Sequence, residues 1–74
     1  MMYSDEKIVY KDFGERIKFL RKKHNLSQSK LAAKTELEKS SIQRIERGSN
    51  ITLKTMIQIA NAFDISLSEL CDIS

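Results

Sequence analysis

An all-α fold of five short helices in one small domain is predicted by three features of this 74-residue sequence. The chain has no proline and only two glycines, and its β-branched residues never form a long alternating run. Four stretches also share a helix-start pattern, the hydrophobic staple, in which one apolar residue precedes the cap and another follows it four positions later. The staples are Leu26/Ser27/Leu31, Leu37/Glu38/Ile42, Ile51/Thr52/Met56 and Ile65/Ser66/Leu70.

Caps and stop residues set the expected ends of the helices. Asp12 can cap the first helix, with Glu15 three residues later as its capping-box partner. Asn25 is expected in the left-handed position that ends this helix, and Gly48 at positive φ ends the third. The predicted helices span residues 12–24, 28–34, 39–47, 53–62 and 67–72.

Residues 1–11 are expected to form an N-terminal extension that precedes a domain of residues 12–74. A frayed terminus is the simplest interpretation, although residues 8–10 (Ile-Val-Tyr) are apolar and the first helix offers them a surface. Phe19 lies about 200° round that helix from the core residue Ile17, and therefore outside its apolar stripe. We hypothesise that the N-terminal segment or a partner chain covers Phe19.

The C-terminal part of the chain carries two further apolar sets. The fourth helix is expected to bury Met56, Ile57, Ala60 and Phe63. The end of the chain is both acidic and apolar, and two interpretations of it stay open, burial in the core and a homodimer surface. The residues concerned are Phe63, Ile65, Leu67, Leu70, Cys71 and Ile73.

The stretch 26–48 predicts two short helices joined by a sharp corner. Leu31 and Ala32 fall on one side of the first of these helices, and Ile42 and Ile45 form a stripe on the second. Donors and acceptors that can read base edges in a major groove lie on the outward side of the second helix, at Lys39, Ser40, Gln43, Arg44 and Arg47. Such a pair of helices is a helix-turn-helix.

This stretch resembles the helix-turn-helix of the phage repressor and Cro type, also called the xenobiotic-response-element type. The family's run of Gln-x-x-Leu-Ala, a turn, and Ile-x-x-Ile/Leu-Glu-x-Gly matches Gln28, Leu31, Ala32, Ile42, Ile45, Glu46 and Gly48. The similarity extends outward to Arg21 and through residues 53–70, so it covers most of the chain. It implies a compact five-helix, lambda-repressor-like DNA-binding domain.

The resemblance also implies which residues contact DNA. Phosphates would be held at the start of the second helix and around the start of the fourth, by Ser27, Gln28, Arg47, Asn50, Thr52 and Lys54. Bases would be read by Lys39, Ser40, Gln43 and Arg44. Of these, Arg44 is the strongest candidate, because a guanidinium group fits the two major-groove acceptors of guanine and discriminates by about 1–3 kcal/mol.

Two further positions matter for the geometry of the motif. In the family Glu46 pairs with an arginine of the first helix, and Arg21 occupies that place here. The turn position after Thr35 is commonly glycine, whereas this chain has Glu36. Either Glu36 adopts a left-handed conformation, which costs about 1 kcal/mol, or the turn follows another path and changes the angle of the recognition helix.

Enzyme classes and metal sites find no support in the sequence. There is one histidine, and Cys71 is the only cysteine, so neither a histidine pair, nor a cysteine-based zinc site, nor a disulfide within the chain is available, and we find no Cys/His arrangement for catalysis. No glycine-rich phosphate loop is present. We therefore expect a non-enzyme without cofactor, metal or small-molecule ligand. In the absence of a signal-peptide core or an apolar membrane span, we expect a soluble, cytoplasmic protein.

The charge distribution is uneven along the chain. Residues 12–54 hold eleven Lys and Arg against five Asp and Glu, whereas residues 55–74 hold three acidic residues and no basic one. The positive charge therefore accompanies the helix-turn-helix, as expected for a protein that binds a polyanion.

The predicted function is sequence-specific binding of double-stranded DNA by a transcriptional regulator, as a homodimer on a pseudo-palindromic operator. Phage repressors, restriction-modification controllers and antitoxins all fit this description. The alternative is a protein-interaction module, such as an antitoxin that masks a toxin and binds DNA only weakly alone.

Overall fold

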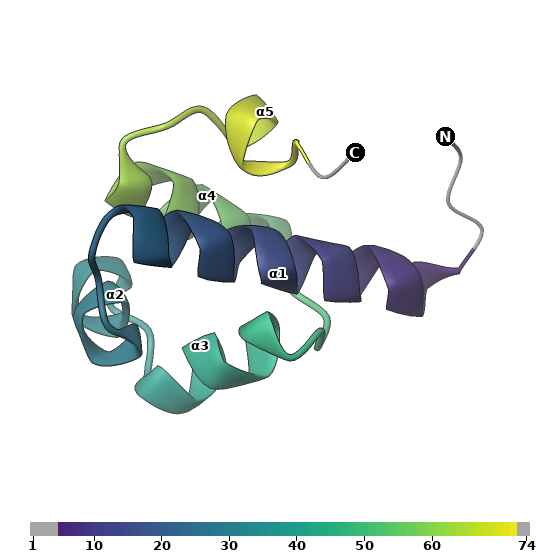
Figure 1. The fold of residues 1–74 in the computed structure, drawn as a ribbon, viewed down its shortest axis with the longest axis horizontal. Coiled ribbons are helices and arrows are strands. Elements are labelled where there is room, and N and C mark those ends of the chain that lie inside the picture. Colours follow the sequence, from purple (N-terminus) through teal and green to yellow (C-terminus); the bar gives the residue numbers. More distant parts are fainter. Residues whose placement is uncertain (1–4, 73–74) are drawn as a thin grey trace.

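The structure is a computed structural model, and it describes residues 5–72. Its elements are α1 (Glu6–Lys23), α2 (Gln28–Thr35), α3 (Lys39–Glu46), α4 (Leu53–Phe63) and α5 (Leu67–Leu70) (Figure 1). There is no strand in the part of the chain described, so the predicted all-α class with five helices is confirmed. None of these helices combines the length and the apolar character needed to cross a bilayer.

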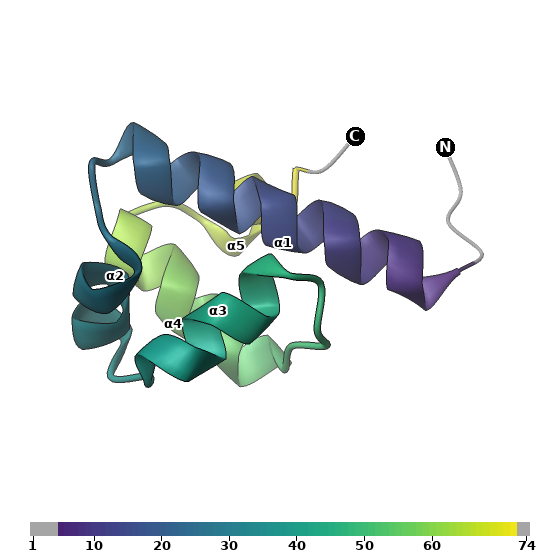
Figure 2. The same cartoon turned by 60° about the horizontal axis from the view of Figure 1, so that its bottom comes forward.

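The five helices pack around one core. In Figure 1, α1 runs across the middle of the molecule, with α2 and α3 towards one side of it and α4 and α5 towards the other. Figure 2 shows α3 in front of α4, with α1 above both. Each helix contributes one fully buried aliphatic side chain, and these are Ile17, Leu31, Ile42, Ile59 and Leu70. Each such burial contributes about 1.5–3 kcal/mol, which ties every helix to the same core.

The helix starts follow the predicted caps at four of the five helices. The hydroxyl oxygens of Ser27, Thr52 and Ser66 accept hydrogen bonds from the backbone N–H groups three residues later, at 3.1, 3.2 and 3.0 Å. Glu38 occupies the cap position of α3, where its side chain makes no capping hydrogen bond. The apolar members of the staples pack in or against the core.

The first helix begins six residues earlier than predicted. Asp5, not Asp12, is its cap, and its carboxylate accepts a hydrogen bond of 2.9 Å from the N–H of Lys7. Val9 and Tyr10 are half-buried and line an apolar pocket with residues of α1, α4 and the chain after α5. Because residues 6–11 are helical and Val9 and Tyr10 are partly removed from water, the frayed terminus that we predicted is wrong for residues 5–11.

Phe19 remains on the outside of α1, with 57% of its surface exposed. Residues 6–11 continue the axis of α1, so they do not fold back over Phe19 as hypothesised. Its neighbour is Arg16, whose guanidinium carbon lies 6.0 Å from the centroid of the ring. Cover by a partner chain stays a hypothesis.

Two predictions about the C-terminal apolar residues need correction. Ile57 is 44% exposed, whereas Ile59 is fully buried, because the core lies under the face of α4 that also carries Ala60 and Phe63. Phe63 and Leu70 are buried in the core and are therefore wrong as dimer-surface residues. Ile65 and Leu67 are half-buried against the core, and Ile73 lies outside the described residues.

Candidate nucleic-acid interface

The corner between α2 and α3 is built around a buried threonine. The Thr35 hydroxyl donates to the carbonyl oxygen of Leu31 at 2.9 Å and accepts from the N–H of Leu37 at 3.4 Å. Glu36 adopts the left-handed conformation, with φ 60° and ψ 22°, and its N–H bonds to the carbonyl of Ala32. The turn therefore keeps its left-handed residue although this position holds Glu36 instead of glycine, and the alternative backbone path is not taken.

A buried cluster of polar side chains joins α1, α2 and α3. Arg21 donates to both carboxylate oxygens of Glu46, from Nε at 2.6 Å and from Nη2 at 3.2 Å. Its Nη1 also donates to the carbonyl oxygen of Leu26 at 2.9 Å. Gln28 adds a third donor to Glu46, from Nε2 at 3.2 Å. The pair implied by the resemblance is thus present, and its carboxylate fixes the end of α3 to both preceding helices.

Gly14 permits the close approach of α1 to α3, a role that sequence reasoning missed. A Cβ atom at Gly14 would lie 2.4 Å from the carbonyl oxygen of Ile45 and 3.0 Å from that of Glu46. The signal that could have revealed this contact is the glycine itself, since glycine within a helix costs about 1 kcal/mol relative to alanine. Backbone contact between the two helices offsets that loss.

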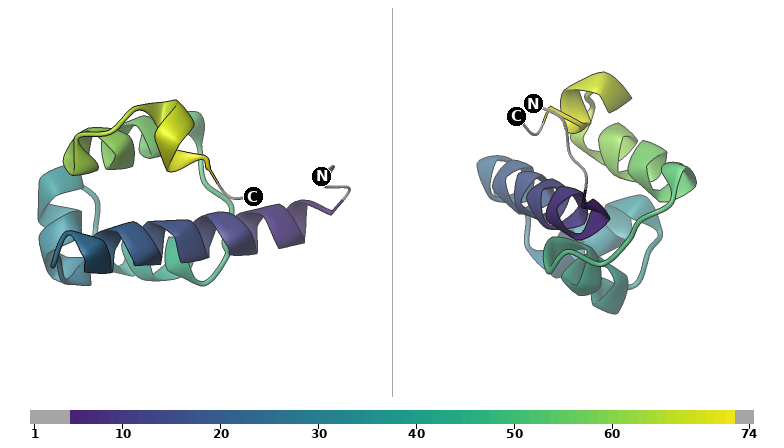
Figure 3. Two further views of the ribbon diagram at one scale, coloured as in Figure 1. Left: turned by 45° about the horizontal axis from the view of Figure 1, so that its top comes forward. Right: turned by 90° about the vertical axis from the view of Figure 1, so that its right-hand side faces the viewer.

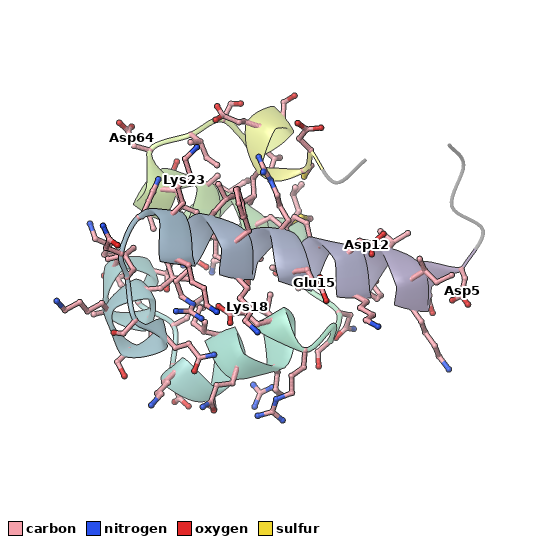
Figure 4. All side chains as sticks on the ribbon, in the orientation of Figure 1. Asp5, Asp12, Glu15, Lys18, Lys23 and Asp64 are labelled. Atoms are coloured by element: carbon pink, nitrogen blue, oxygen red, sulfur yellow. The ribbon has the colours of Figure 1, made fainter. Side chains whose placement is uncertain are left out.

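The outer face of α3 carries most of the predicted base-reading residues. Lys39, Ser40 and Arg44 are exposed, and Gln43 is half-buried. Figure 4 shows side chains of α3 that end in nitrogen projecting on the side facing away from α1. Ile42 and Ile45 hold the opposite side of α3 in the core. The outer face of α3 is therefore polar and positively charged, and the opposite face anchors the helix in the core.

Arg44 lines one pocket with two of the predicted phosphate contacts, and Lys39 does not line it. The Nη2 atom of Arg44 donates to the hydroxyl oxygen of Ser41 at 3.3 Å, and this pocket of about 310 Å³ is also lined by Asn50 and Thr52, among others. Lys39 lies about 140° round the axis of α3 from Arg44. The structure therefore groups Arg44 with the start of α4 and leaves Lys39 beside the corner of the motif.

The remaining phosphate candidates are arranged in two groups. Ser27 caps α2, while the amide of Gln28 is turned towards Glu46. Thr52 caps α4, and its hydroxyl donates to that of Thr55 at 3.0 Å. Arg47, Asn50 and Lys54 are exposed around the α3–α4 loop. Both groups flank α3, as phosphate contacts on either side of a groove require.

Comparison with known proteins agrees with this geometry. A helix-turn-helix family profile, HTH_3, matches residues 17–70. The chain belongs to this helix-turn-helix family. The resemblance to Cro-type regulators is therefore confirmed, and the family is one of DNA-binding transcriptional regulators, not a class of enzymes.

Individual members of the helix-turn-helix family are similar over most of this chain. The control protein C.BamHI of Bacillus amyloliquefaciens is 36% identical over 62 residues, which are 81% of this chain and 76% of that protein. The restriction-modification controller protein C.AhdI from Aeromonas hydrophila has a crystal structure that matches with a TM-score of 0.86 and 36% identity. That match covers 89% of this chain and 97% of C.AhdI.

A longer family member also shares the fold. The structure of an HTH_3 family transcriptional regulator from Vibrio cholerae matches with a TM-score of 0.84 and 30% identity. It covers 89% of this chain but 38% of the Vibrio protein, so the shared part is the helix-turn-helix domain. The chain is thus a helix-turn-helix regulator homologous to restriction-modification controllers.

Proposed function

We propose that this protein is a sequence-specific regulator of transcription that binds a pseudo-palindromic operator in double-stranded DNA as a homodimer. Its proposed class is that of the restriction-modification controllers. The observation that carries the proposal is the polar outer face of α3, held by the Arg21–Glu46–Gln28 cluster in a fold that matches C.AhdI over most of both chains. A recognition helix with a rigid position is what direct readout of bases requires.

The proposed contacts are those that the resemblance implies. Lys39, Ser40, Gln43 and Arg44 would read bases, while residues at the start of α2 and between the end of α3 and the first turn of α4 would hold phosphates. The latter are Ser27, Gln28, Arg47, Asn50, Thr52 and Lys54. The position of Arg44 beside Asn50 supports a base contact near one end of the half-site, next to the phosphates that set the register.

A homodimer is proposed because one such helix contacts too few base pairs for tight specific binding. Leu53 and Ile57 supply the surface, since they are 57% and 44% exposed and lie one helical turn apart on α4. Thr55 lines the same pocket as Arg44 and therefore faces α3. Leu53 and Ile57 each lie about 160° from Thr55 round the axis of α4. A second copy bound there would leave α3 free for DNA.

The test is selection of bound DNA from a random duplex library at physiological salt, with Arg44→Ala and Arg44→Lys run beside the parent. We expect the parent to enrich a pseudo-palindrome. Arg44→Ala should relax the preference at one symmetric base pair by about 1–3 kcal/mol. Arg44→Lys keeps the charge but loses the bidentate fork, so it should retain affinity better than it retains base preference.

A protein-interaction module, such as an antitoxin that masks a toxin, predicts a different result. Neither the parent nor the variants would then enrich a sequence, and DNA binding would be weak at physiological salt. Either observation would contradict the proposed function.

A further inference from the structure

One flank of α1 carries three lysines that lie on the same side as Gly14. With a rotation of about 100° per residue, Lys7, Lys11 and Lys18 each fall within about 60° of Gly14 round the helix axis. Gly14 faces the backbone of α3, because a Cβ atom there would meet the Ile45 carbonyl oxygen at 2.4 Å. Figure 4 draws Lys18 on the side of α1 that is turned towards α3. We call these three residues the α1 basic row.

The middle of the α1 basic row lies directly against the end of α3. A Cβ atom on Gly48 would be 3.2 Å from the Cα atom of Lys11 and 3.5 Å from its Cβ atom. Gly48 opens the loop that leads to Asn50, and two residues of chain span at most about 7 Å. Lys11 is therefore next to the loop to which we assign phosphate contacts.

The row also continues a charged edge of α3. Glu46 faces Arg21 of α1, and Arg47 follows it about 100° further round α3 and is exposed. The flank of α1 and the outer face of α3 thus meet along the side that carries Gln43 and Arg47. A duplex that receives α3 in its major groove would bring the bordering backbone towards this flank.

The three lysines have no competing partner in the part of the chain that the structure describes. All three are exposed, and no hydrogen bond or ion pair engages their ammonium groups within residues 5–72. Glu15 lies between Lys11 and Lys18 in sequence, and Figure 4 shows it on the lower side of α1 together with Lys18. It offsets one of the three positive charges and leaves the flank basic.

The length of the row suits a nucleic-acid backbone. From Lys7 to Lys18 the helix rises about 16 Å, whereas phosphates on one strand recur about every 3.4 Å along the duplex axis. The first turns of α1 extend past α3 and α4 in Figure 2 and in the left view of Figure 3. The row therefore reaches beyond the surface that α3 itself presents.

We propose that the α1 basic row is a second contact with the DNA backbone, binding phosphates that border the groove occupied by α3. This inference rests on the proposed function and adds residues that the helix-turn-helix pattern does not include. The contact would raise affinity and salt dependence without reading sequence.

The experiment measures the affinity for the selected operator by fluorescence anisotropy between about 0.05 and 0.2 M salt, a range over which phosphate contacts make affinity strongly salt-dependent. Lys11→Ala and Lys18→Ala should each lower the magnitude of the slope of log K against log salt by about 0.9. The triple variant with Lys7→Ala should lose roughly tenfold or more in affinity with unchanged base preference. Glu15→Gln should raise the affinity.

Lys23→Ala is the matched control, because Lys23 is an exposed lysine of α1 that lies about 180° from Gly14 round the axis. It removes the same charge and should leave the slope unchanged. Lys11→Arg and Lys18→Arg should keep parental binding, and thermal melting of each variant checks the fold.

Equal slopes for the row variants and Lys23→Ala would overturn this inference while leaving the proposed function intact. Failure of the parent protein to select any DNA sequence would instead overturn the proposed function itself. A loss of base preference in the row variants would also contradict a contact made with phosphates alone.

Discussion

At the scale of single residues, Glu46 is the centre of the helix-turn-helix. Its carboxylate accepts three hydrogen bonds, two from Arg21 and one from Gln28, while the side chains of Glu46 and Arg21 are only 5% and 11% exposed. Two charges that are removed from water stabilise each other only when their geometry is good and their remaining donors and acceptors are hydrogen-bonded. Glu46 therefore sets the position of α3 through partners that belong to both α1 and α2.

Glu46→Ala is expected to destabilise the fold by about 3–5 kcal/mol, because it leaves the guanidinium of Arg21 buried without its counter-ion. Thermal or urea unfolding followed by circular dichroism measures the change. Glu38→Ala is the control, since Glu38 is exposed and forms no capping hydrogen bond. Equal melting temperatures for the parent and Glu46→Ala would contradict a stabilising role for the pair.

At the scale of helices, the contact between α1 and α3 is a contact of backbones. Gly14 brings the two helices together where any larger side chain would meet the carbonyl oxygens of Ile45 and Glu46. The same contact turns the lysines of α1 towards the edge of α3. A small residue in the middle of α1 thus decides how α3 is presented.

Gly14→Ala is expected to lower the free energy of unfolding by about 1–3 kcal/mol, although alanine is the better helix former by about 1 kcal/mol. The reason is overlap with backbone atoms, which cannot rotate away as a side chain can. The midpoint of urea unfolding measures the effect. Glu15→Ala, at the next and exposed position, should be close to neutral. A stabilised Gly14→Ala protein would show that α1 and α3 separate at no cost.

At the scale of the whole molecule, the exposed apolar residues lie apart from the outer face of α3. Among the residues described, the exposed large apolar side chains are Ile8, Phe19, Leu53 and Ile57. Leu53 and Ile57 are neighbours on α4, whereas Phe19 lies alone on the outside of α1. Contiguous apolar surface favours association, so α4 is the better candidate for the proposed dimer surface.

We expect the double variant Leu53→Asp and Ile57→Asp to be monomeric in analytical ultracentrifugation, at concentrations where the parent is a dimer. Its melting temperature as a monomer should change little, because both side chains are already largely in solvent. Phe19→Asp is the matched control, since Phe19 is as exposed as Leu53 at 57%. If Phe19→Asp dissociated the dimer and the α4 variant did not, the partner chain would cover α1 instead.

Features that depend on residues close together in the chain could be predicted from the sequence. The caps at Ser27, Thr52 and Ser66 and the left-handed residue Asn25 are local, because a few backbone groups and one side chain decide them. The all-α class and the core of the helix-turn-helix follow from apolar spacing, which a helix converts directly into one buried face. The pairing of Arg21 with Glu46 came from the family pattern.

Features that depend on contacts between distant segments were decided only in the tertiary structure. Asp5 and Asp12 can both cap a helix, and the partial burial of Val9 and Tyr10, in a pocket that they share with residues more than forty positions away, favours the earlier start. Ile57 is as apolar as Ile59, yet only one of them faces the core. Local sequence states which residues can be buried, but the positions of the other helices determine which ones are, because burial is a property of the assembled surfaces.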